Sequence, residues 1–159
     1  MRILPYKLPS SASRAALLSF VDVTQSHALR RMQAILDAMA PNVAVVDREG
    51  VIAMVNASWL RFAAENGAPD LTRVGVGANY LGACLAPGLD PLDAGTSGQA
   101  ATGLRAVLQG RAESFELEYP CDGPDRKRWF LLHVRALPED IGGAVVSHID
   151  VSAWKYPVP

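Results

Sequence analysis

Hydrophobic and polar residues alternate strictly from Ser114 to Tyr119. The apolar and aromatic positions of this segment fall on one face and the polar positions on the other, so the period of two predicts a half-buried strand. Two more strands are predicted downstream, at Arg128–Arg135, where both faces are largely apolar, and at Ala144–Val151.

A hairpin and a helix are predicted earlier in the chain. Val43–Asp47 and Val51–Val55 are short apolar runs separated by Arg48-Glu49-Gly50, which is typical of two strands joined by a turn. Asn56 is a good helix N-cap, and the segment Ala57–Glu65 that follows is predicted to be a helix ended by Asn66-Gly67.

The segment between Ala68 and Gly103 is rich in glycine and proline. Its short apolar pieces, around Tyr80-Leu81 and Ala83–Leu85, indicate short helical turns among loops. Thr102–Leu108 is predicted to be one further helix, closed by a glycine at position 110.

Residues 25–40 contain neither glycine nor proline and are predicted to form a linker helix that stops at Pro41, with Thr24 as its cap. Its apolar side chains follow a 4-3-4 spacing, at Ala28, Met32, Ile35 and Met39. This stripe is either a coiled-coil-like dimer seam or the face that packs on the helix's own domain.

The apolar pattern of residues 17–24 recurs at residues 145–152, 128 positions later, each copy ending in Asp-x-Ser/Thr. A repeat at this spacing indicates that the first copy is the tail strand of a preceding domain of the same type, left without a partner. We therefore expect a tail strand at 1–24, a linker helix at 25–40, a domain at 41–152 and a C-terminal tail at 153–159.

Composition narrows the class of protein. Among 159 residues, 50% are hydrophobic and 19% are charged, which is typical of a folded domain, and the net charge of −1 argues against a nucleic-acid-binding face. No apolar run approaches the ~20 residues that cross a membrane, and a signal peptide is not evident, so we expect a cytoplasmic location. Cys84 and Cys121 lack CxxC spacing and are expected to be reduced.

Four pieces of the chain, taken in order, resemble the PAS sensory domain. They are residues 45–52, 55–59, 128–130 and 147–152, and the resemblance extends from Ile35 to Ser152. It implies an α+β PAS fold, with a five-stranded antiparallel sheet and short helices on one face. The N-terminal residues 2–6 and 20–24 resemble the end of PAS modules fused to bacterial chemotaxis methyltransferases and signalling kinases, which implies the C-terminal part of a multidomain signalling protein.

The resemblance also implies a ligand pocket between the helices and the concave face of the sheet. Carried onto this sequence, the candidate pocket residues are Val46, Met54, Tyr80, Leu81, Cys84, Leu104, Val107, Phe115, Leu117, Phe130, Leu132 and Val134. The same side chains would equally make a solid core.

No cofactor is predicted. Flavin-binding relatives that sense light carry a cysteine directly after the asparagine of a Gly-x-Asn motif, whereas here Asn79 is followed by Tyr80. Haem-binding relatives need an axial histidine, and the helix predicted at Thr102–Leu108 has none. The cysteines and histidines show no metal-ligand spacing, and no motif orders a catalytic nucleophile, so neither a metal site nor an enzyme is expected.

Signal relay and dimerisation are the remaining expectations. A carboxylate at the end of a strand, followed by a hydroxyl where a helix can begin, would couple the position of the sheet to the start of the helix. The candidate relay residues are Asp22, Thr24, Asp150 and Ser152. The alternative is that Ser152 only ends its strand. The dimer would use the linker-helix stripe and the outer sheet face at Trp129, Leu131 and His133. The sequence thus predicts a homodimeric sensor that relays a ligand's effect through its N-terminal helix, or alternatively a ligand-free PAS interaction module.

Overall fold

The computed structural model describes residues 2–7, 14–19, 24–66, 70–85, 91–121 and 127–155, with the backbone alone at 2–7, 14–19, 24 and 91–94. The chain divides into two compact units, Met1–Met32 and Gln33–Pro159.

The first unit contains a two-stranded antiparallel hairpin. Strand β1 (Arg2–Lys7) pairs with β2 (Arg14–Ser19), and Leu4 lies opposite Leu17. The expected partnerless strand at 17–24 was therefore wrong in two respects: it begins earlier, and the segment 2–7, which the sequence pattern did not mark as a strand, pairs with it. Residues 20–23 of that prediction, with Asp22, lie outside the described residues.

Helix α1 (Thr24–Asp37) ends three residues before the predicted Ala40. The side-chain amide of Asn56 donates hydrogen bonds to the carbonyls of Leu36 and Met39, at 3.1 and 3.3 Å from its Nδ2. Because these carbonyls are hydrogen bonded by a side chain outside the helix, the helix can end before Pro41.

The second unit is built on a five-stranded antiparallel sheet with the order β4-β3-β7-β6-β5. The strands are β3 (Asn42–Val46), β4 (Ile52–Val55), β5 (Ser114–Pro120), β6 (Trp129–Ala136) and β7 (Ala144–Asp150). All four strand pairs are antiparallel, and β7 lies at the centre. The predicted α+β architecture and strand order along the chain are confirmed.

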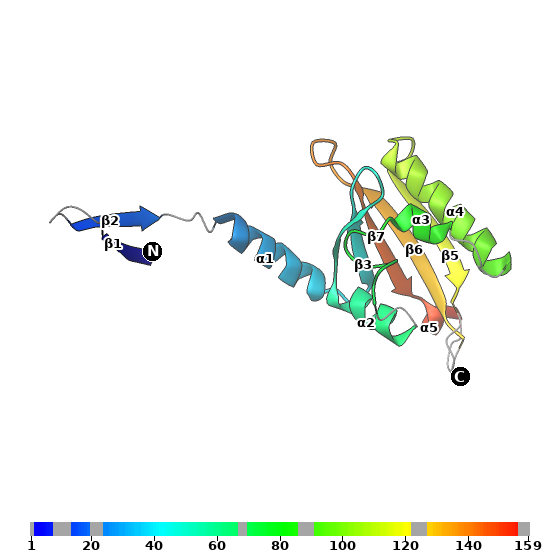
Figure 1. The fold of residues 1–159 in the computed structure, drawn as a ribbon. Coiled ribbons are helices and arrows are strands. Elements are labelled where there is room, and N and C mark those ends of the chain that lie inside the picture. The colour runs from blue at the N-terminus through cyan, green and yellow to red at the C-terminus, as the bar shows by residue number, and fades with distance from the viewer. Residues whose placement is uncertain are drawn as a thin grey trace. The chain divides into compact units, whose positions relative to one another are not determined.

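Helices α2 (Ala57–Glu65), α3 (Tyr80–Cys84) and α4 (Pro91–Leu108) lie on one face of this sheet, as Figure 1 shows, and α5 (Ser152–Lys155) follows β7. The predicted bounds of α2 are confirmed at both ends. Its cap is Asn56, whose Oδ1 accepts a hydrogen bond from the Trp59 amide at 2.9 Å.

Helix α4 is longer than predicted, because only Thr102–Leu108 was expected to be helical and the helix begins at Pro91. Proline is well suited to the first turn of a helix. The C-terminal half of α4 is held by the buried side chains of Ala101, Leu104 and Val107. Packing of that half on the sheet outweighs the low helix propensity of Gly95 and Gly98.

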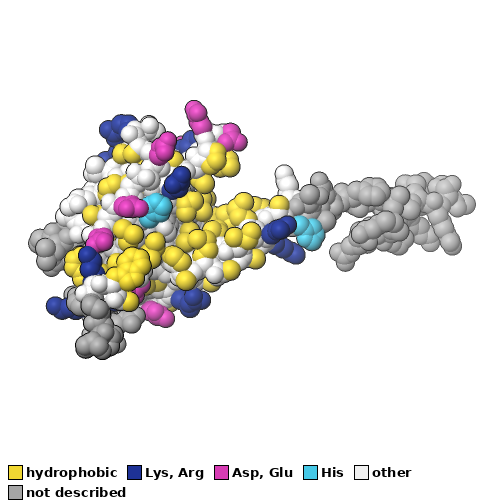
Figure 2. All heavy atoms as spheres, turned by 180° about the vertical axis from the view of Figure 1, so that it is seen from behind, with side chains coloured by type: hydrophobic (Ala, Val, Ile, Leu, Met, Phe, Trp, Pro, Cys, Tyr) yellow, Lys and Arg dark blue, Asp and Glu magenta, His cyan; other side chains and the backbone are white. Residues whose placement is uncertain are grey.

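The core lies between the helices and the inner face of the sheet. Side chains alternate along β6, where Phe130, Leu132 and Val134 are buried and the residues between them are half-exposed. Figure 2, seen from behind, shows hydrophobic side chains on the opposite face of the sheet, away from α2, α3 and α4, and along α1. None of the helices described here is both long enough and apolar enough to cross a membrane.

Candidate functional site

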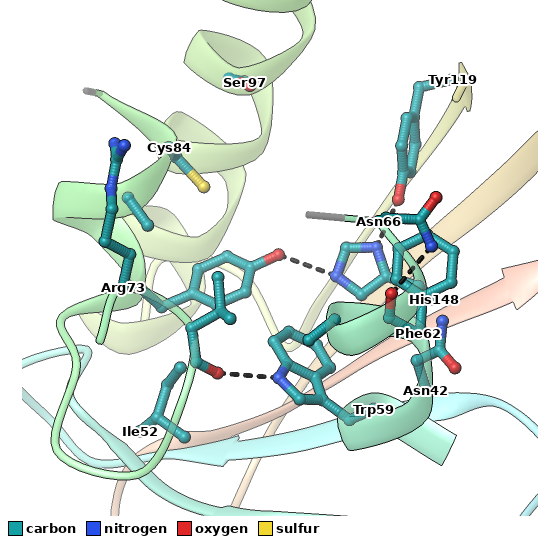
Figure 3. A pocket seen from close by; sticks show the side chains of 14 residues that line it. Asn42, Ile52, Trp59, Phe62, Asn66, Arg73, Cys84, Ser97, Tyr119 and His148 are labelled. Atoms are coloured by element: carbon teal, nitrogen blue, oxygen red, sulfur yellow. Dashed lines mark hydrogen bonds between the residues drawn. The ribbon is translucent and has the colours of Figure 1, made fainter. Parts of the chain in front are cut away.

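A cavity of about 310 Å³ lies between α2, α3 and the inner face of the sheet (Figure 3). This volume is at the small end of the range for ligand sites, which run from ~300 to ~1,000 Å³. Its lining combines aromatic, small apolar and uncharged polar side chains with one arginine: Asn42, Ile52, Trp59, Phe62, Ala63, Asn66, Arg73, Val74, Tyr80, Ala83, Cys84, Ser97, Tyr119 and His148.

His148 is the polar centre of the cavity and stands between two tyrosines (Figure 3). Its Nε2 is 2.9 Å from the Tyr80 hydroxyl, and its Nδ1 is 2.5 Å from the Tyr119 hydroxyl. The three residues come from α3, β5 and β7, so the fold brings together side chains that are 68 and 29 positions from His148 in the chain.

His148 occupies the central strand. It lies opposite Asn42 of β3 and Leu132 of β6, which places its side chain on the inner face with Leu132 beneath the helices. The Trp59 ring packs beside it, with 5.5 Å between ring centroids. Because the Trp59 Nε1 donates to the Val74 carbonyl at 2.8 Å, the indole is fixed as one wall of the cavity.

Tyr80 is placed by an extension of the β4 edge. A single antiparallel bridge joins Val51 to Asn79, and the Tyr80 amide donates to the Gly50 carbonyl at 2.9 Å. Gly50 has φ of +79°, a conformation that glycine adopts without strain. Asn79 then caps α3, its Oδ1 accepting from the Gly82 amide at 2.8 Å, so the phenol of Tyr80 is aimed inward from the first residue of the helix.

Burial keeps His148, Cys84, Tyr80 and Tyr119 of the cavity uncharged at neutral pH. It lowers the pKa of His148 from its usual 6.5 to about 4 and raises the pKa of the Cys84 thiol to about 11. The pKa values of Tyr80 and Tyr119 are also raised, chiefly by burial. Cys84 and Tyr119 add to the effect at Tyr80, and Cys121 and Cys84 add to it at Tyr119. His148 is half-buried and lines the cavity.

A buried arginine supports the wall next to Tyr119. The Arg128 guanidinium lies 5.2 Å from the ring centroid of Phe62 and 5.9 Å from that of Phe130. It donates to the Asn66 Oδ1 at 2.6 Å and to the Cys121 carbonyl at 3.2 Å. Arg128 therefore fixes Asn66 and Phe62, two lining residues, through hydrogen bonding and cation–π contact.

Two of the twelve predicted pocket residues, Tyr80 and Cys84, line the cavity. Seven others belong to the core or pack against it without lining the cavity: Val46, Leu81, Leu104, Val107, Phe115, Leu117 and Leu132. Val134 is likewise buried in the core, and Phe130 is buried against Phe62 and Tyr119. Met54 pairs with Val45, and neither residue belongs to the core cluster.

The sequence interpretation missed His148, Tyr119 and Trp59 as lining residues. Tyr119 shares the inward face of its strand with Phe115 and Leu117, so the alternation that selected those two already pointed to it. His148 carried no such signal, because its neighbours in the cavity are distant in the chain.

The residues predicted to relay a signal lie at the start of α1 and around the end of β7, except Asp22, which is outside the described residues. Thr24 is the first residue of α1, and its side chain is outside the described part. The Asp150 Oδ1 accepts from the Ser152 amide at 2.9 Å, at the start of α5. The Ser152 Oγ accepts from the Trp129 amide at 2.9 Å, so this hydroxyl ties α5 to strand β6.

The residues predicted to form a dimer interface lie on exposed surfaces. Met32, Ile35 and Met39 on α1 are 49%, 60% and 41% exposed, and Ala28 is exposed as well. Trp129, Leu131 and His133 are half-exposed on the outer sheet face. The Lys155 ammonium lies 5.1 Å from the Trp129 ring centroid and 2.5 Å from the Glu118 carboxylate, so α5 covers part of that face. Within the described part of the chain, no cluster of three or more potential metal ligands occurs.

Known proteins similar to this chain identify its family. The PAS fold family matches residues 36–154. An uncharacterized 104.1 kDa protein of Rhodobacter capsulatus, from the hypE 3′ region, is 49% identical over 154 residues, which is 97% of this chain and 16% of that protein. The chain thus spans about a sixth of its relative's length.

Solved structures share the fold at low sequence identity. The PAS domain of Bordetella pertussis BvgS has a TM-score of 0.50 and 16% identity, covering 79% of this chain and 87% of that one. The sensor region of a sensor histidine kinase has a TM-score of 0.53 and 14% identity, covering 98% and 65%. The chain belongs to the PAS fold family, and its fold is shared by the sensor region of a histidine kinase.

Proposed function

We propose that this PAS domain is the sensory part of a larger protein, that it binds a small molecule in the cavity around His148, and that it passes the effect of binding to helix α1. The observation that carries the proposal is the Tyr80–His148–Tyr119 arrangement inside a cavity of about 310 Å³. Aromatic walls with a few convergent polar groups are the usual composition of a ligand site.

A single side chain supports the transmission step. The Asn56 Oδ1 accepts from the amides of Val43 and Trp59, at 3.0 and 2.9 Å, and its Nδ2 donates to the carbonyls of Leu36, Met39 and Pro41. Trp59 is a wall of the cavity, and the three carbonyls belong to the end of α1 and the turn after it. Movement of Trp59 on ligand binding would therefore strain the contacts that hold this helix end.

Two more contacts fasten the same helix end. The Asp37 Oδ1 accepts from the Ala57 amide at 2.8 Å, and the Gln33 Nε2 donates to the Val55 carbonyl at 2.9 Å. Asp37 and Gln33 also hydrogen bond to each other at 2.9 Å. The last turn of α1 is thus coupled to the start of α2 and the end of β4.

The second element of the proposal is a homodimer. The exposed apolar stripe of α1 has the spacing of a two-helix seam, and Leu29 beside it is 59% exposed. Apolar side chains of this size rarely line up on a helix face that meets only water. A dimer through α1 would place the output end of each sensor beside that of its partner.

The ligand is tested by mass spectrometry under native and then denaturing conditions, together with an absorbance scan. We expect a mass excess in the native protein that disappears on denaturation. Ala83→Leu adds bulk to the cavity lining and is expected to abolish the excess, whereas Ala53→Leu, at an exposed position of β4, should retain it. A bare mass for the wild-type protein would favour the ligand-free interaction module instead.

A further inference from the structure

The hydrogen bonds around His148 can be counted. An uncharged imidazole has one N–H donor and one acceptor nitrogen, and each phenol has one proton. Both nitrogens of His148 are within hydrogen-bond distance of a tyrosine hydroxyl. One tyrosine must therefore donate to the ring while the other accepts from it, and the accepting tyrosine has its own proton left over.

The surroundings of His148 keep it uncharged. The groups that face it are Tyr80 from α3, Trp59 from α2, Tyr119 from β5 and Asn42 from β3. Cys84 completes this side of the cavity as a thiol, and no aspartate or glutamate is among the described lining residues. The charged lining residue, Arg73, is exposed at the rim, and the guanidinium of Arg128 lies behind Asn66.

We infer that Tyr80, His148 and Tyr119 form an uncharged hydrogen-bond relay that presents one free phenol donor to the cavity at a time, and that its ligand is a small, flat, uncharged molecule carrying a hydrogen-bond acceptor. The ligand class rests on the proposed function, since it assumes that the cavity is a binding site. The relay itself does not, because it follows from the geometry of the three side chains.

The relay has two arrangements with the same number of protons. In the first, Tyr119 donates to Nδ1, the ring N–H is on Nε2 and points to the Tyr80 oxygen, and the Tyr80 proton is free. In the second, Tyr80 donates to Nε2, the ring N–H is on Nδ1, and the Tyr119 proton is free. Exchange moves one ring proton from Nε2 to Nδ1 with water as the carrier and turns both hydroxyls.

This arrangement selects the ligand by charge. A carbonyl or ring-nitrogen acceptor is satisfied by the single free phenol proton and selects the His148 tautomer that supplies it. A cation would lose hydration in the cavity, and none of the described lining residues has a carboxylate that could pair with it. A carboxylate needs two donors, whereas an uncharged ring with both hydrogen bonds leaves one phenol proton free. A second phenol donor requires the ring to give up a hydrogen bond or to take up a proton, which burial opposes. Arg73, the cationic lining residue, is exposed to water, which weakens its attraction for an anion.

The relay is tested without any ligand by long-range ¹H–¹⁵N correlation of the histidine rings, with His148→Gln assigning the signal. Tyr119→Phe leaves Nδ1 without a partner, so the ring proton is expected on Nε2, where Tyr80 accepts it. Tyr80→Phe is expected to give the opposite tautomer, with the proton on Nδ1. If both folded variants have the same tautomer, or if His148 is charged at pH 7, the relay is wrong.

The ligand class is tested with three probes of nearly equal shape: benzamide, benzoate and benzamidinium. At pH 7.5 we expect millimolar benzamide to shift the His148 and Tyr80 or Tyr119 resonances, and benzamidinium and benzoate to bind more weakly by about tenfold or more. Stronger binding of either ion than of benzamide, or no binding of all three, would overturn the ligand class. Since the tautomer test uses no ligand and mass spectrometry detects any ligand, each of the three claims fails separately.

Discussion

His148 concentrates several properties of this domain in one side chain. It is the only residue of the described lining that hydrogen bonds through two ring nitrogens, and it lies on the strand that pairs with both β3 and β6. Because the folded protein holds it uncharged, its protonation is linked to folding as well as to the cavity.

We expect the linkage to appear as a pH dependence of stability. The pKa of His148 is about 4 in the folded protein and about 6.5 when unfolded, so the unfolded chain binds the extra proton between these values. The free energy of unfolding should therefore fall as the pH decreases from about 6.5 to 4, by up to about 3 kcal/mol from this residue.

Denaturant titrations over this pH range measure the effect. His148→Gln should remove this part of the slope, whereas His133→Gln, on the outer face of the sheet, should leave it in place. Equal slopes in the wild-type protein and the His148 variant would show that the imidazole is not held uncharged.

Asn56 is the second residue on which the domain depends. Asn56→Asp keeps the oxygen that caps α2 but replaces the Nδ2 donor with a second oxygen. That oxygen would face the three carbonyls to which the Asn56 amide donates. We expect a loss of about 2–4 kcal/mol in the free energy of unfolding and faster hydrogen exchange at Ala38 and Met39. Asn79→Asp, in the exposed N-cap of α3, is the matched control and should change stability by less than about 0.5 kcal/mol.

At the scale of elements, α4 is a helix whose glycines have unlike roles. A Cβ at Gly103 would lie 2.3 Å from the Phe115 ring, so this glycine lets the helix approach β5 closely. Gly98 has no atom within 4 Å of such a Cβ. The missing side chain is therefore needed at Gly103, where it offsets the low helix propensity of glycine, whereas at Gly98 that low propensity has no such compensation.

This difference predicts opposite effects of the same substitution. Gly103→Ala should lower the free energy of unfolding by about 1–3 kcal/mol through overpacking, and Gly98→Ala should raise it by about 0.5–1 kcal/mol through helix propensity. Thermal and urea unfolding of the two variants compare them directly. A stabilising Gly103→Ala would mean that α4 does not pack on Phe115 as described.

Elements with local signals could be predicted from the sequence. The Asn56 cap with Asn66-Gly67 defined α2, and the alternation at Ser114–Tyr119 defined β5. The first half of α4 could not, because its helical state depends on packing by residues further along. In the same way, Tyr80 and Cys84 could be predicted as lining residues because they belong to a local apolar segment. His148 could not, because its position opposite Asn42 exists only once β3 and β7 are adjacent.

At the scale of the whole molecule, the proposed dimer is the feature open to direct measurement. Multi-angle light scattering should give twice the chain mass for the wild-type protein. Ile35→Glu puts a charge into the exposed stripe and should shift the mass to that of one chain, whereas Ala34→Glu, beside the stripe, should not.

The outer face of the sheet is tested in the same way. Trp129→Ala should weaken the dimer if that face takes part, since Trp129 is the largest side chain there. A Trp129→Ala variant that remains dimeric would confine the interface to α1 and would leave Trp129 as the support of Lys155 and helix α5.

The pairing of β3 with β7 has a consequence for how such a domain is carried in a long chain. Residue 42, where the chain comes into the sheet from α1, lies opposite residue 148, just before the chain leaves it toward α5. Both connections therefore sit side by side at one end of the sheet. A unit of this kind can therefore be added to a longer chain or removed from it with little change in the distance between the segments on either side.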